Sequence, residues 1–124
     1  MKKFLLPVLL LVMGLMVFAA CGAQDVDPNN PLIGRWTWDE HTTYVYTFNA
    51  DGTGTRGGAL FGGLEGFTWW TTNNDSRLEL RMDTRVSGQA TNQPWDITWN
   101  GNDQITLTSR LRGSSEVFTY SRVD

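Results

Sequence analysis

The sequence predicts an all-β fold, namely a small eight-stranded antiparallel up-and-down barrel that follows an N-terminal signal helix. From Leu32 onward, apolar and polar residues alternate in almost every segment, a pattern typical of strands with one buried and one solvated face. Turns rich in Asn, Asp and Gly separate these runs at 49–52, 73–76 and 100–103, and such residues accept the positive φ angles of tight hairpins. No segment after the signal keeps a helical apolar period, so no long helix is expected there.

Residues 1–20 are predicted to be a cleaved export signal. A positively charged start, an apolar run over residues 4–18 and a final alanine pair follow in the order that such signals require. A membrane-spanning helix is the alternative, but it needs about 18 or more consecutive apolar residues. Pro7 and Gly14 interrupt this run, which favours the signal peptide.

Cys21 directly follows the small residues of the predicted cleavage site. This arrangement resembles the lipobox of bacterial lipoproteins, in which the cysteine is lipidated, with chains such as palmitate, and becomes the first residue of the mature protein. The resemblance implies that the chain is exported and anchored to the cell membrane or outer envelope through lipid on Cys21. A buried structural thiol is the alternative for this lone cysteine.

Residues 21–31 are predicted to be a flexible tether, because they are polar, contain two prolines and show no apolar period. Their last residues are expected to form a short turn that plugs one end of the fold. Residues 32–124 are then a single domain, since about 90 residues suffice for one small core and not for two. No cysteine follows Cys21, so this domain depends on hydrophobic packing.

The alternating runs place eight strands in chain order. We expect them near 33–39, 42–49, 53–57, 66–72, 77–83, 94–99, 104–110 and 115–122. Short hairpins join nearly all of them, which favours a closed barrel over the alternative, an open β-sandwich. Closure also removes the exposed edges that a flat sheet of this size would leave.

The stretch 57–66 is predicted to be the most adaptable loop of the domain. It contains five glycines around Leu60, Phe61 and Leu64, so it combines backbone freedom with apolar side chains. It is either a lid or partner-binding loop, or a long hairpin folded over the barrel mouth. Just downstream, Trp69 is expected to point inward and Trp70 outward, where Trp70 either marks a contact surface or is covered by this loop.

The opening strand carries the sequence Gly34-Arg35-Trp36, and a Tyr-Thr-Phe-Asn-x-Asp-Gly-Thr-Gly hairpin follows over 46–54. Together these motifs resemble small lipocalin-like (calycin) domains of bacterial lipoproteins, whose function is largely uncharacterised. The resemblance implies a lipocalin-like barrel in which an arginine from the end of the chain lies across Trp36. Arg122 is the matching position, and a solvated Arg122 is the alternative.

The predicted inward face is large and aromatic. It comprises Trp36, Trp38, Tyr44, Tyr46, Phe48, Phe67, Trp69, Leu78, Leu80, Met82, Trp95, Ile97, Trp99, Ile105, Leu107, Phe118 and Tyr120. An eight-stranded barrel is just wide enough to be filled by side chains or to hold one small ligand. The sequence leaves both a solid core and a pocket open.

The mature chain is acidic, with eight arginines against thirteen carboxylates and a net charge of −5. This balance argues against nucleic acid as a partner. His41 is the only histidine and lies in a polar turn, where a surface residue is expected rather than a metal ligand or a catalytic base. No motif for a cofactor, a metal or nucleophilic catalysis is present, so we do not expect an enzyme.

Two functions therefore remain. The first is a membrane-anchored, non-catalytic binding module for a small apolar or amphipathic ligand. The second is a protein-interaction or inhibitor module of the cell envelope with a filled core. For either, the candidate contact residues are the aromatic and apolar side chains of the barrel rim and of the 57–66 loop, namely Trp38, Tyr46, Leu60, Phe61, Leu64, Trp69, Trp70 and Trp95.

The lipid anchor can be tested directly. We expect Cys21→Ser to release the protein from membranes or to block its maturation, because serine offers no thiol for lipidation. Membrane fractionation and the mass of the processed chain measure this. A variant that is processed as before and still fractionates with membranes contradicts the prediction.

Overall fold

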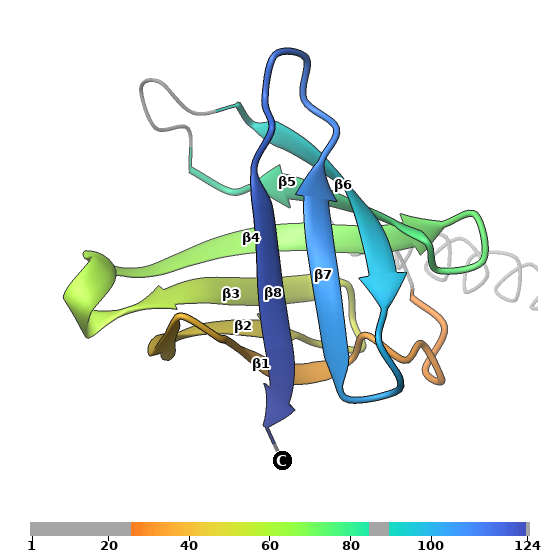
Figure 1. Cartoon of the computed structure of the whole chain (residues 1–124), viewed down its shortest axis with the longest axis horizontal. Helices are drawn as coiled ribbons and strands as arrows, with labels where there is room; N and C mark the ends of the chain where they lie inside the picture. The colour runs from red at the N-terminus through yellow and green to blue at the C-terminus, as the bar shows by residue number, and fades with distance from the viewer. Residues whose placement is uncertain (1–25, 85–89, 124) are drawn as a thin grey trace, which may run out of the picture.

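The computed structural model describes residues 26–84 and 90–123 and shows a closed antiparallel barrel (Figure 1). The elements follow in the order β1 (Gly34–Trp38), β2 (His41–Phe48), β3 (Thr53–Gly58), the 3-10 helix η2 (Ala59–Phe61), β4 (Gly63–Thr72), β5 (Arg77–Met82), β6 (Asn92–Trp99), β7 (Gln104–Ser109) and β8 (Val117–Val123). The predicted eight-stranded barrel is therefore confirmed. The predicted signal, Cys21 and the start of the tether lie outside the described residues.

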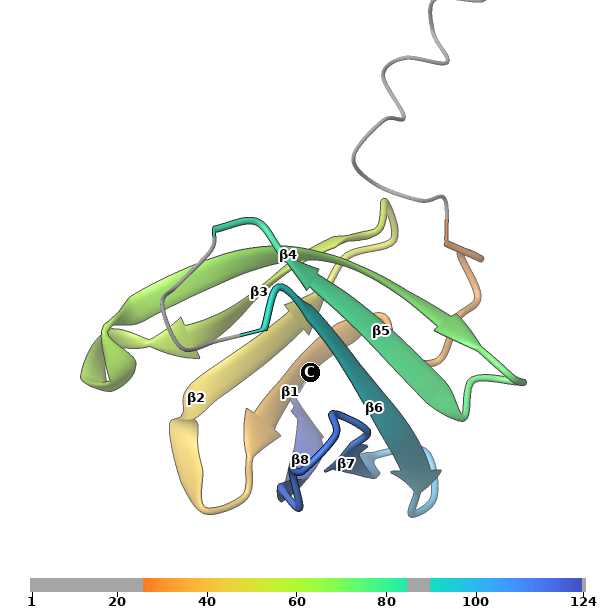
Figure 2. The ribbon, with the colours of Figure 1, turned by 90° about the horizontal axis from the view of Figure 1, so that it is seen from above.

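Closure comes from β1, which pairs with β2 on one side and with β8 on the other. Each remaining strand pairs with its neighbours in chain order, and Figure 2 shows β2 to β6 arching over β1, β7 and β8. The barrel thus leaves no open strand edge among the described residues, which protects the sheet from edge-to-edge association.

The inward-facing residues form one core, as the alternation predicts. Every residue expected to point inward is either buried in this core or packed against it. Leu32 joins the core from the segment before β1 and is fully buried. Several buried side chains have less than 2 % exposure, namely Trp36, Trp69, Phe48, Phe67, Leu32, Leu78, Leu80, Ile105 and Leu107.

The segment before β1 closes one end of the barrel. A turn brings the amide of Asn30 2.8 Å from the carbonyl of Asp27, and the Asn30 side chain is almost fully buried. Its Nδ2 donates to Thr71 Oγ1 at 2.8 Å, and its Oδ1 accepts from the Leu32 amide at 2.9 Å. The plug predicted for the end of the tether is therefore present.

Arg122 fastens this plug across the closed end. Its guanidinium carbon lies 4.3 Å from the centre of the Trp36 ring, so the contact implied by the lipocalin resemblance is formed. Its Nη2 donates to the carbonyl of Pro31 at 2.7 Å, and the Trp36 indole donates to the carbonyl of Leu32 at 2.9 Å. Gly34 is required here because a Cβ at this position would lie 3.0 Å from Arg122 Nη1, and its φ is +135°.

The stretch 57–66 differs from the prediction, because it is not a ten-residue loop. The β3–β4 ladder continues through Gly57↔Leu64 and Gly58↔Gly63, and only η2 and Gly62 connect the strands. The ribbon extends beyond the rest of the barrel with η2 at its tip (Figure 1). Gly57 and Gly58 allow close approach of the backbone, since a Cβ at Gly57 would overlap the carbonyl oxygen of Gly63 and one at Gly58 would overlap that of Thr43.

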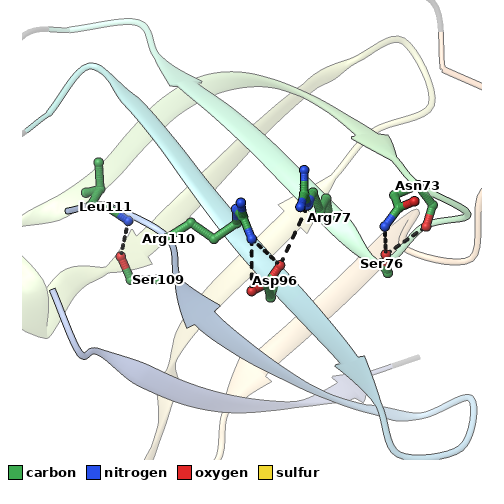
Figure 3. A network of polar contacts seen from close by, with 7 residues as sticks. All are labelled: Asn73, Ser76, Arg77, Asp96, Ser109, Arg110 and Leu111. Carbon is green, nitrogen blue, oxygen red and sulfur yellow. Dashed lines mark hydrogen bonds and ion pairs between the residues drawn. The ribbon is translucent and has the colours of Figure 1, made fainter.

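Asp96 on the outer face of β6 is paired with two arginines from neighbouring strands. Asp96 accepts from Arg110 Nη1 at 3.1 and 3.3 Å and lies 3.9 Å from Arg77 Nε (Figure 3). These half-exposed ion pairs contribute little to stability, about 0–1 kcal/mol each.

Trp36→Ala tests the closed end. We expect it to lower the free energy of unfolding by about 3–5 kcal/mol, the range for removal of a buried large aromatic, because the ring supports both Leu32 and Arg122. Chemical denaturation followed by circular dichroism measures the change. A loss below about 1 kcal/mol, the size of a surface effect, contradicts this role.

Gly58→Ala tests whether 57–66 is strand or loop. We expect a loss of about 1–3 kcal/mol, typical of forced overpacking, because the added Cβ meets the backbone of Thr43. Gly66→Ala is the matched control, since its Cβ would meet only the flexible Asp83 side chain, at 2.7 Å. Equal thermal stability of the two variants would indicate that residues 57–66 form a loop that can move away from Thr43, which contradicts the strand assignment.

Candidate functional site

A cavity of about 430 Å³ lies at the end of the barrel opposite the plug. It is formed where β1, β6 and β8 carry Trp38, Trp95 and Phe118 near the open end. Exposed residues, including Ala90 and Glu116, line it as well, so the cavity reaches the surface there. The barrel is thus filled at one end and hollow at the other, and a volume of this size suits a small molecule.

Six aromatic side chains make up most of the wall: Trp38, Tyr44, Tyr46, Trp95, Phe118 and Tyr120. Tyr46 and Tyr120 are almost fully buried and meet edge to face, with ring centres 5.1 Å apart. Nearer the mouth, Phe118 lies 5.6 Å from Trp38 and 5.9 Å from Trp95, again edge to face. Rings that support one another in this way give the cavity fixed walls.

Arg56 brings a positive charge into this aromatic wall. The residue is 7 % exposed, and its Nε donates to Glu65 Oε1 at 3.0 Å. Its Nη1 donates to the Tyr46 hydroxyl at 3.0 Å and to Gln93 Oε1 at 2.8 Å. Gln93 is itself held by a bond from Nε2 to the carbonyl of Ala90 at 3.1 Å. A buried charge is tolerated only when it is paired and hydrogen-bonded, and this network provides both.

The three tyrosines and the arginine of the wall keep one charge state near neutral pH. Burial raises the pKa of Tyr44, Tyr46 and Tyr120 above the usual value for a phenol, so all three hydroxyls stay protonated. Burial lowers the pKa of Arg56, but its contacts with Tyr46 and Glu65 outweigh this effect and the net shift is upward. The cavity therefore presents neutral phenols and a permanent cation.

Trp95 has a buried indole N–H without an acceptor among the described residues. The indoles of three other tryptophans each donate to a backbone carbonyl: Trp36 to Leu32 at 2.9 Å, Trp69 to Asn49 at 3.1 Å and Trp99 to Asp75 at 2.8 Å. An unpaired buried donor costs about 1–3 kcal/mol. Among the described residues, the buried side-chain donor without a partner thus lies in the wall of the cavity.

The structure brings three of the predicted contact residues together, because Trp38, Tyr46 and Trp95 all line the cavity. Phe61 lies behind this wall, with its ring centre 5.1 Å from that of Tyr44 and 6.3 Å from that of Trp38. The tip of the β3–β4 ribbon therefore supports the wall from outside without entering the cavity.

The other predicted contact residues lie elsewhere. Leu60 and Leu64 are 78 % and 67 % exposed on the ribbon. Trp69 is fully buried in the filled half, and Trp70 alternates with it onto the outer face of β4, opposite Glu79. His41 is exposed at the start of β2, and its ring lies tilted against that of Trp38 with the ring centres 4.9 Å apart. It is therefore a surface residue, as expected.

Sequence reasoning missed Arg56 and Gln93, although a signal for both exists. Gly54 pairs with the inward-facing Phe48, so alternation along β3 also turns Arg56 inward. Likewise, Gln93 lies two residues before Trp95 and shares its inward face. Both residues are polar, so a pattern of alternating apolar residues does not include them. In addition, β6 begins earlier than the predicted strand, which left Gln93 outside it.

Comparison with known proteins returns no matching family model, no matching curated protein and no matching solved structure. Within 26–84 and 90–123, no helix has the length and apolar character needed to cross a membrane. The same residues contain no group of three or more His, Cys, Asp or Glu side chains suited to a metal ion.

Proposed function

We propose that this protein is a membrane-anchored, lipocalin-like binding module that holds a small amphipathic ligand in its aromatic cavity. The observation that carries the proposal is the cavity itself, with a volume of about 430 Å³ and walls of six aromatic rings. Binding sites for small molecules are typically concave, largely apolar and furnished with few polar groups, and Arg56 and Gln93 are such groups here.

The position of the cavity is compatible with a lipid anchor on Cys21. The chain enters the barrel at the plugged end, and Figures 1 and 2 both show this segment opposite the η2 tip. An anchor that precedes residue 26 therefore leaves the mouth of the cavity accessible to a ligand from the surrounding medium.

The groups in the cavity support binding rather than catalysis. General acid–base catalysis favours a group whose pKa lies near the working pH. The tyrosine pKa values are shifted away from neutrality, and so is that of Arg56. The arrangement therefore suits reversible binding of a ligand that is not chemically altered.

The exposed apolar tip of the β3–β4 ribbon favours a second candidate, a contact with another envelope protein. Leu60, Phe61 and Leu64 are all exposed there, and apolar side chains that gather on a protruding element often mark an interaction surface. If the ribbon tip makes such a contact, the double variant Leu60→Ser, Leu64→Ser should abolish binding to the partner protein. Binding of a ligand in the cavity should stay unchanged.

Blocking the mouth tests the binding module. We expect Ala90→Trp to weaken the binding of both dodecanol and dodecanoate at least tenfold, because Ala90 lines the cavity and an indole there occupies the space of a ligand. Equilibrium dialysis of the Cys21→Ser chain with radiolabelled probes measures the affinities without detergent.

Ala50→Trp is the matched control, since Ala50 is exposed in the turn between β2 and β3, away from the cavity. It should bind both probes as the parent chain does. Two results count against the cavity as a ligand site: neither probe binds the parent chain, or Ala90→Trp binds both unchanged.

A further inference from the structure

We infer that the cavity selects amphiphiles with a carboxylate head, which binds at Arg56 beside Trp95 while the apolar chain extends along the aromatic wall toward the mouth. The inference rests on the proposed function and deepens it by assigning the chemical class of the ligand. It stands on hydrogen-bond donors in the cavity wall that have no acceptor among the described residues.

Arg56 still has donors to offer after its protein contacts are counted. Its Nε is used by Glu65, and the two hydrogens of Nη1 are used by Tyr46 and Gln93. Its other terminal nitrogen, Nη2, donates to no residue within the described part of the chain. A guanidinium nitrogen with two free N–H groups matches the oxygens of a carboxylate.

The neighbouring hydroxyls can add further donors. The Tyr46 oxygen already accepts from Arg56, so its own hydrogen remains to be donated. Tyr120 lines the same cavity, and burial keeps its hydroxyl protonated by raising its pKa. A ligand head rich in acceptors pairs with Arg56 and with these hydroxyls, whereas a head that only donates leaves the Arg56 N–H groups unpaired.

Trp95 points to the same head-group chemistry. The residue is 5 % exposed, lines the cavity and has an indole N–H without an acceptor among the described residues. The nitrogen itself is covered in this structure, so the inference includes a bond to the carboxylate that forms only when the ligand moves the ring.

The surrounding charges favour a head with a single negative charge. Glu65 already offsets part of the Arg56 charge at 3.0 Å. Among the described residues, Glu116 is the only carboxylate that lines the cavity, and it lies at the exposed rim. A phosphate dianion would meet one partly neutralised cation and a repelling carboxylate, whereas a monoanion is matched by Arg56 alone.

Two probes that differ only in the head group test the inference. We expect the Cys21→Ser chain to bind dodecanoate at least tenfold more tightly than dodecanol at pH 7, since hydrogen bonds to a charged group change affinity by about this much. Arg56→Gln should remove the preference, lowering dodecanoate affinity about tenfold and dodecanol affinity by less than about twofold. Equilibrium dialysis measures both, and circular dichroism checks the fold.

Trp95→Phe keeps an aromatic side chain in the wall but removes the indole N–H, so it serves even if Arg56→Gln does not fold. It should weaken dodecanoate binding about three- to tenfold more than it weakens dodecanol binding. Trp99→Phe is the matched control, because the Trp99 indole already donates to Asp75 near the closed end, and it should leave both affinities unchanged.

The outcomes separate the two proposals. If the parent chain binds both probes equally, or if Arg56→Gln and Trp95→Phe weaken both probes alike, the carboxylate inference is wrong and the binding module stands. If neither probe binds, the proposed function fails and the inference fails with it.

Discussion

The architecture depends on the contact between Arg122 and Trp36 at the closed end of the barrel. The guanidinium lies 4.3 Å from the indole centre and also donates to the carbonyls of Pro31 and Ile33. One residue of β8 thereby holds the segment that precedes β1, next to the seam where the first and last strands pair. A cation over an indole face contributes about 0.5–2 kcal/mol, more when water is excluded, and here it coincides with the pairing that closes the sheet.

Closing one end firmly allows the other end to stay hollow. Leu32, Trp36 and Trp69 fill the plugged half with apolar volume. Toward the mouth, the side chains are only partly buried, as at Trp38, Tyr44 and Phe118. They line the cavity instead of filling the barrel. A small barrel is just wide enough for either outcome, so the same sheet supports a solid core at one end and an open cavity at the other.

The buried arginine is the feature that distinguishes this cavity from a gap in the packing. A hydrophobic residue at position 56 would avoid the desolvation cost of a charge, and replacing buried ion pairs by apolar residues is often neutral or stabilising. Here Arg56 is instead held by Tyr46, Gln93 and Glu65, which orients a cation toward the cavity. The proposed binding of an anionic ligand would explain why a charged residue is kept at this position.

The sequence by itself determined the strands, their up-and-down order and the inward face, because alternation and turn residues are local properties that survive in any antiparallel sheet. It also indicated the role of Gly34, Trp36 and Arg122 through the lipocalin resemblance. Only the tertiary structure decided that 57–66 continues the β3–β4 ladder. The reason is that Gly57 and Gly58 lie against the backbone of Gly63 and Thr43, which belong to the neighbouring strands. Only the tertiary structure revealed the cavity and placed Arg56, Gln93 and Trp95 together in its wall, because the balance between filled and hollow volume depends on how side chains from distant strands meet.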